Sequence, residues 1–194
     1  MNKTSILSLA LLALAGLPAS ASLIATATIT PSQIDATDYH YDIVLNDTGT
    51  TTVGTFWFAW KPGQDFMPVQ PTNILSPANW TDLVTGGGPG DGFAIQWVAS
   101  AGSELAAGAS LPGFSFDSTA TPAQIAGDSQ FFDNPPVGTS FVYSLTPFSD
   151  PGFSFVAASN PLASSAPEPA TLGLGAAALV LLPGARRIFR RKRA

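Results

Sequence analysis

Apolar and polar residues alternate with a period of two in short blocks through the middle of the chain, between residues 22 and 163. Turn-forming Gly, Pro, Asn and Asp residues separate these blocks, and no helical period continues for three turns. The blocks cover residues 23–30, 39–46, 51–60, 93–99, 113–117, 140–145 and 152–157. The pattern predicts an all-β domain over residues 22–163, an Ig-like or fibronectin-like β-sandwich, with a jelly roll as the second choice.

A leader precedes this region. Lys3 is followed by an apolar run over residues 6–17, then by Pro18 and Ala19-Ser20-Ala21. This is the layout of a secretory signal peptide over residues 1–21, with small residues Ala19 and Ala21 at the signal-peptidase site and the cut after Ala21. An uncleaved anchor is the alternative, but the apolar run is too short to cross a bilayer core of about 30 Å.

The last part of the chain, residues 164–194, has a different pattern. Pro167-Glu168-Pro169 is an extended, helix-breaking tripeptide, and residues 170–185 after it carry no charge. A basic tail over residues 186–194 ends the chain, with Arg186, Arg187, Arg190, Arg191, Lys192 and Arg193. The apolar stretch predicts a short C-terminal transmembrane helix, and the arginines predict that its far end stays in the cytoplasm as a basic stop.

The order of Pro-Glu-Pro, a short apolar helix and a terminal Arg cluster resembles the PEP-CTERM sorting signal. The resemblance implies that an exosortase cuts the chain near Pro167-Glu168-Pro169 and that the product moves to the cell envelope or the extracellular matrix. The same kind of segment is also labelled an ice-binding protein C-terminal domain, but it is an address and says nothing about ice. An ordinary single-span anchor is the alternative.

Composition removes several classes of function. The chain has no cysteine and one histidine, which excludes a thiol enzyme, a Cys-ligated metal and a multi-histidine metal centre. Between residues 22 and 166, Lys61 is the only base against twelve acids, which gives this segment a net charge of −11. A domain this acidic is not a nucleic-acid binder.

No catalytic residue is assigned, and we expect the protein not to be an enzyme. His40 is the only imidazole, and it lies on the face of its strand opposite Tyr39 and Tyr41, where we expect it to meet solvent. No G-x-S-x-G elbow occurs, and acids such as Asp35 and Asp38 have turn-forming neighbours. The glycine-rich residues 86–92 lie in a long stretch, 62–92, that we interpret as an irregular loop.

No cofactor is expected, with Ca²⁺ as the alternative. Oxygen ligands in acidic loops suit this ion, and the candidate pairs are Asp35 with Asp38 and Asp128 with Asp133. Solvated acids that keep the domain soluble explain the same pattern.

Two tryptophans are candidate ligand contacts. Residues 55–60 are apolar on both faces, so either loops cover the outer face or Trp57 belongs to an exposed aromatic patch. Trp80 lies in the irregular stretch and is predicted to be exposed. Ice binding through Thr26, Thr28 and Thr30 would need more such strands than the chain has.

The sequence thus predicts an exported bacterial envelope or matrix protein with a structural or adhesive role. Its expected partners are signal peptidase, exosortase, the membrane through the C-terminal helix before processing, and exopolysaccharide or biofilm by implication of the resemblance. The alternative is an extracellular carbohydrate-binding module or hydrolase that uses loop acids and aromatics.

Overall fold

Two five-stranded sheets and a small hairpin make up residues 21–162, the part of the chain that this computed structural model describes. Residues 1–20 of the predicted leader and the predicted sorting signal lie outside it. Among the described residues, no helix is long and apolar enough to cross a membrane. The predicted transmembrane helix over residues 170–185 falls outside the described part.

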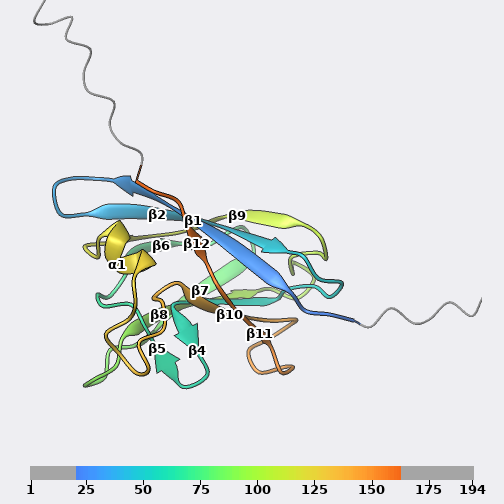
Figure 1. Cartoon of the computed structure of the whole chain (residues 1–194). Helices are drawn as coiled ribbons and strands as arrows, with labels where there is room; N and C mark the ends of the chain where they lie inside the picture. Colours follow the sequence, from blue (N-terminus) through green and yellow to red (C-terminus); the bar gives the residue numbers. More distant parts are fainter. Residues whose placement is uncertain (1–20, 163–194) are drawn as a thin grey trace, which may run out of the picture. The chain divides into compact units, whose positions relative to one another are not determined.

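Sheet I has the order β12-β1-β2-β9-β6. Its strands are β1 (Ala25–Gln33), β2 (Tyr39–Asp47), β6 (Thr72–Leu75), β9 (Ser110–Ser118) and β12 (Ala158–Ser159). Its strands pair antiparallel except that β12 runs parallel to β1. In Figure 1 β1, β2 and β9 cross the upper half of the molecule.

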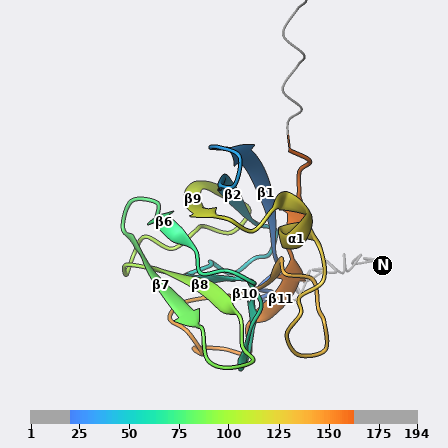
Figure 2. The ribbon, with the colours of Figure 1, turned by 90° about the vertical axis from the view of Figure 1, so that its left-hand side faces the viewer.

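Sheet II has the order β11-β10-β3-β8-β7, with antiparallel pairing throughout. Its strands are β3 (Thr55–Phe58), β7 (Trp80–Gly86), β8 (Phe93–Ala99), β10 (Thr139–Tyr143) and β11 (Phe153–Val156). The hairpin joins β4 (Trp60–Lys61) to β5 (Gln64–Asp65), and one helix, α1 (Pro122–Ala126), lies between β9 and β10 in the chain. Figure 2 shows sheet I above sheet II, with α1 at one side.

The alternation seen in the sequence decides which face of each strand is buried. Ala25, Ala27 and Ile29 of β1 point inward, as do Tyr41 and Ile43 of β2, and the residues between them are exposed or half-buried. Side chains of successive strand residues point to opposite faces, so this pattern directs one face of sheet I at the core. The predicted all-β class is confirmed.

Aromatic rings fill the space between the sheets. The ring of Phe114 in β9 meets Phe56 of β3 at 5.5 Å and Trp97 of β8 at 5.3 Å, both edge-to-face. Phe116, two residues on, meets Phe58 of β3 at 5.6 Å. These residues are fully buried, so sheets I and II share one hydrophobic core.

The prediction of an irregular loop over residues 62–92 is wrong in part. It contains β5, β6 and β7, of which β6 and β7 are edge strands of the two sheets. The predicted first strand was also too short, because β1 continues through Pro31 to Gln33. Proline is tolerated there because β12 pairs with β1 only at Thr28 and Ile29, so β1 is an edge strand at Pro31.

Candidate functional sites

A second apolar cluster lies on the outer face of sheet II, away from the main core. It is formed by Trp57 of β3, Trp60 of β4, Ala94 of β8, and Phe141 and Tyr143 of β10, and each is at most 8% exposed. We call its four aromatic residues together with Phe148 the aromatic cluster. Trp57 and Trp60 have ring centroids 3.5 Å apart, and Phe141 meets Trp60 edge-on at 5.6 Å.

Phe148 is the exposed member of the aromatic cluster. Its side chain is 66% exposed, yet its ring lies 5.4 to 6.1 Å from those of Tyr143, Trp57 and Trp60. Its φ angle is +63°, a left-handed conformation that costs free energy in a bulky residue. The loop between β10 and β11 therefore holds one phenyl ring out to solvent on a base of buried rings.

Asp150 holds this loop in shape. Its carboxylate accepts hydrogen bonds from the backbone N–H and the hydroxyl of Ser144, and from the N–H of Gly152 at 2.6 Å. Burial raises the pKa of this carboxyl, but these hydrogen bonds outweigh burial and hold the pKa below its usual value. Gly152 has φ +68°, and a Cβ there would lie 2.0 Å from the Phe141 ring, so the loop packs tightly on the cluster.

A histidine and two acids gather on the outer face of sheet I. His40 of β2 lies directly opposite Asp117 of β9, and its Nδ1 is 2.6 Å from the Asp117 carboxylate. Its Nε2 is 3.4 Å from Asp42, and Asn73 donates to Asp117 at 2.8 Å. The bond to Asp117 raises the pKa of His40. The hydrogen bonds from Asn73 and His40 outweigh burial and lower the pKa of Asp117.

Asp65 and Asp91 meet beside the glycine-rich turn. Asp65 is buried, and burial raises the pKa of its carboxyl. Thr85 donates to this carboxylate at 2.6 Å, and the Asp91 carboxylate accepts from the N–H groups of Asp65 and Gly92. These contacts join the β4–β5 hairpin to the end of β7, so both acids stabilise the local structure.

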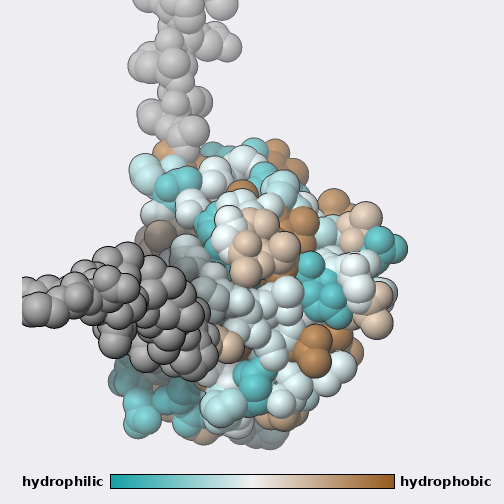
Figure 3. Space-filling view, turned by 90° about the vertical axis from the view of Figure 1, so that its right-hand side faces the viewer, coloured by the Kyte–Doolittle hydropathy of each residue, from teal (hydrophilic) through white to brown (hydrophobic). Residues whose placement is uncertain are grey.

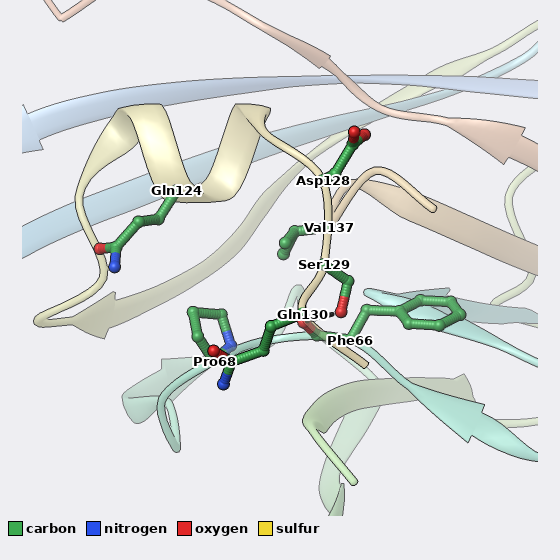
Figure 4. Close-up of a pocket in the computed structure, with 7 residues that line it drawn as sticks. All are labelled: Phe66, Pro68, Gln124, Asp128, Ser129, Gln130 and Val137. Carbon is green, nitrogen blue, oxygen red and sulfur yellow. Dashed lines mark hydrogen bonds between the residues drawn. The ribbon is translucent and has the colours of Figure 1, made fainter. Parts of the chain in front are cut away.

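A small pocket of about 140 Å³ opens beside α1. Figure 4 shows it, lined by Phe66, Pro68, Gln124, Asp128, Ser129, Gln130 and Val137. The Ser129 hydroxyl donates to the Phe66 carbonyl at 3.1 Å, and the Asp128 carboxylate points away from Pro68 and Gln130. The pocket therefore offers side-chain amides, and it has no base positioned beside its one hydroxyl.

Three of the predicted calcium ligands have other surroundings in the structure. Asp35 accepts from the N–H groups of Thr37 and Asp38 at 2.8 and 2.9 Å, and these bonds lower its pKa, as expected of an acid that closes a turn. Asp133 lies 3.8 Å from Lys61 Nζ, whereas Asp128 lines the pocket. Within residues 21–162 no group of three or more His, Asp or Glu side chains could hold a metal ion.

The predicted aromatic contacts need correction. Trp80 is not exposed: it is 6% exposed because its ring meets Phe114 edge-on at 5.2 Å. Trp57 is 5% exposed, so the expectation that its face is covered is confirmed, and the exposed-patch alternative is wrong for this residue. His40 does lie on the outer face, but it is half-buried against Asp117. The exposed Phe148 was missed, since a single loop aromatic has no periodicity.

No family model and no curated protein matches the chain. Among solved structures, it is similar to the chitin-binding domain of Chi18aC from Streptomyces coelicolor, with 22% identity and a TM-score of 0.31 over 48% of this chain and 77% of that chain. It is also similar to a GH20 exo-β-N-acetylglucosaminidase from Vibrio harveyi, with 8% identity and a TM-score of 0.36 over 74% of this chain and 19% of that chain. Values this low carry no argument about function.

Proposed function

We propose that the chain is an exported, non-catalytic protein of a bacterial envelope or extracellular matrix, cut near Pro167-Glu168-Pro169 by an exosortase. The observation that carries the proposal is that Ser22 and Asn160, which lie between the two predicted cuts and near them, both bond to the β domain. Ser22 is the first residue after the predicted signal-peptidase cut, and its carbonyl accepts from the N–H groups of Thr50 and Thr51 at 2.8 and 3.2 Å.

Asn160, near the second predicted cut, is also bonded to the β domain. Asn160 donates its backbone N–H to the Ile29 carbonyl at 2.8 Å and its side-chain amide to Thr30 at 2.9 Å. These are contacts to β1 made shortly before the Pro-Glu-Pro tripeptide. Cuts after Ala21 and near Pro167 would therefore leave the hydrogen bonds of Ser22 and Asn160 in the mature domain, which supports a domain made to be released from both ends.

For the exported domain we propose an immunoglobulin-type topology. Constant-type immunoglobulin domains have the strand orders A-B-E-D and C-F-G. The orders β1-β2-β9-β6 and β3-β10-β11 follow this scheme if the strands of these two orders are lettered in chain order. The β4–β5 hairpin is then an insertion between the third and fourth strands, and the β7–β8 hairpin is an insertion between the fourth and fifth. The strand orders support this topology; β12 adds a parallel strand beside β1.

The sorting part of the proposal is tested by replacing Pro167-Glu168-Pro169 with three alanines. The prolines keep the backbone extended outside the membrane, and alanines allow the helix to grow outward and remove the recognised group. In an exosortase-bearing host, we expect the variant to stay in the membrane fraction with its arginine tail, while the wild-type chain loses the tail. Intact-mass spectrometry measures both.

A matched control replaces Ser164-Ser165 with two alanines, which changes the approach to the tripeptide and leaves the tripeptide itself. We expect this variant to be processed like the wild type. If the triple-alanine chain loses its tail as fully as the wild type, or if both chains keep it, the sorting proposal is wrong.

A further inference from the structure

The exposed position of Phe148 does not help to stabilise the described domain. Burial of a phenyl ring stabilises a domain, and here two thirds of the ring stays in water while the backbone holds a left-handed conformation. Leu145, in the same loop, is also 53% exposed. Figure 3 shows hydrophobic side chains in small groups on one face of the domain, and exposed apolar side chains mark interaction sites where several gather.

The base below Phe148 is rigid. The carbonyl of Leu145 accepts the Thr55 hydroxyl at 2.6 Å, and the Cβ of any side chain at Gly54 would come within 2.7 Å of that same carbonyl. Together with the Asp150 bonds, these contacts fix both ends of the loop on β3 and β10. A surface held in this way loses little conformational entropy when a ligand binds.

A polar donor lies inside the same cluster. The Nε1–H of Trp57 is buried, and no atom of the described residues accepts it. A buried donor without an acceptor costs free energy, so a ligand hydroxyl that reached it would recover that cost. The exposed ring of Phe148 lies 5.6 Å from the ring of Trp57, at an angle of 72°.

Charge decides the class of ligand. The loop residues Leu145, Thr146, Pro147 and Ser149 are uncharged, and the Asp150 carboxylate is already occupied by hydrogen bonds. A net charge of −11 over the domain repels polyanions. A suitable ligand has apolar C–H faces to contact the Phe148 ring and hydroxyl groups to accept from the buried Trp57 donor. It carries no negative charge, which the acidic domain would repel.

We infer that the Phe148 face of the aromatic cluster binds a neutral polysaccharide, with a sugar ring stacked on Phe148. The inference rests on the envelope or matrix role proposed above and gives that role a binding surface. It does not depend on the sorting signal, because it concerns only the described domain.

The test uses the full chain, purified in a mild detergent, in sedimentation assays with particles of cellulose, chitin and mixed-linkage β-glucan. Alginate beads serve as the anionic probe. We expect the chain to bind one or more of the neutral particles and not alginate, and Phe148→Ala to weaken that binding about tenfold or more, as for a central aromatic contact. Phe148→Tyr keeps the ring and should keep the binding.

Phe132→Ala is the matched control. Phe132 is 43% exposed and also has a positive φ, but it lies in the loop before β10, which Figure 1 shows on the other side of the β4–β5 hairpin from the β10–β11 loop. Binding of a soluble β-glucan should also change the tryptophan fluorescence, because Trp57 and Trp60 adjoin Phe148. Far-UV dichroism of each variant confirms that it is folded.

Four results would overturn the inference. The chain binds none of the neutral particles, or it prefers alginate, or Phe148→Ala and Phe132→Ala lose binding equally. Concentration-dependent self-association that Phe148→Ala abolishes would also overturn it, since the face would then contact a second copy. None of these results bears on the processing of the tail, which mass spectrometry measures separately.

Discussion

Replacing Phe114 with alanine removes the ring that joins the two sheets. Phe114 is fully buried in β9 and meets Phe56, Trp80 and Trp97 of sheet II edge-to-face at 5.5, 5.2 and 5.3 Å. A buried Phe→Ala change costs about 3–5 kcal/mol, and each well-placed aromatic pair adds about 0.5–1.5 kcal/mol to simple burial. We therefore expect Phe114→Ala to lower the free energy of unfolding by about 4–5 kcal/mol.

Urea unfolding followed by tryptophan fluorescence measures this loss, because two of the rings in contact with Phe114 are indoles. Domains of this size have a total stability of about 5–15 kcal/mol, so the variant should unfold at much lower urea or not fold at all. Phe114→Leu keeps most of the volume and should cost about 1–1.5 kcal/mol, which keeps the comparison measurable. Leu83→Ala, at a side chain 56% exposed in β7, is the surface control.

If Phe114→Ala costs no more than Leu83→Ala, the ring does not bridge the sheets, and the shared core described here is wrong. A loss near 1 kcal/mol for both Phe114 variants would have the same meaning, since neither a cavity nor broken ring contacts could then explain it.

Two further predictions concern hydrogen bonds of β2. Because Asp117 raises the folded pKa of His40, the stability from this pair is fully present below the unfolded pKa of about 6.5 and is lost as the pH rises through the folded pKa. His40→Gln removes the imidazole, so the free energy of unfolding should lose this pH dependence. The pair should contribute about 0.5–1 kcal/mol between mildly alkaline and mildly acidic pH, measured by urea unfolding. The same pH dependence in the variant and the wild type would contradict the prediction. Tyr41→Phe leaves the Ala120 carbonyl without its buried donor and should cost about 1–3 kcal/mol by thermal unfolding at constant pH, whereas no loss would show that water replaces the hydroxyl.

Alternation located β1 and β2 because a core on one side and solvent on the other impose a period of two. β3 and β10 are buried on both faces, and their apolar and aromatic residues made them visible in the sequence. In β7, Trp80 is buried but Thr81, Asp82 and Leu83 are all exposed, so an edge strand of this kind has no period to find. In β6 the left-handed Asn73 interrupts an already short strand.

The candidate sites could be predicted less well, since they depend on register. His40 and Asp117 are far apart in the chain and meet only because β2 and β9 pair with these residues opposite each other. Of the acids that the sequence offered for calcium, Asp35 accepts from backbone N–H groups of its own turn, and Asp133 lies near Lys61. Phe148 could not be identified as a candidate contact from the sequence, because the rings beside it come from β3, β4 and β10, which only the fold brings together.

The aromatic residues also explain how the described domain holds together without cysteine. Small exported domains commonly use disulfides to compensate for a modest core, and this chain has none. Here ring contacts take that place between the sheets: Tyr41 stacks on Phe116 at 5.0 Å, and Phe116 in turn meets Phe58 across the core. Such contacts need no oxidising compartment, so folding of the domain should be independent of redox conditions. These rings fill the space between the sheets. The aromatic cluster is separate from that core, because it lies on the outer face of sheet II. This second cluster carries Phe148, the member that is exposed to solvent.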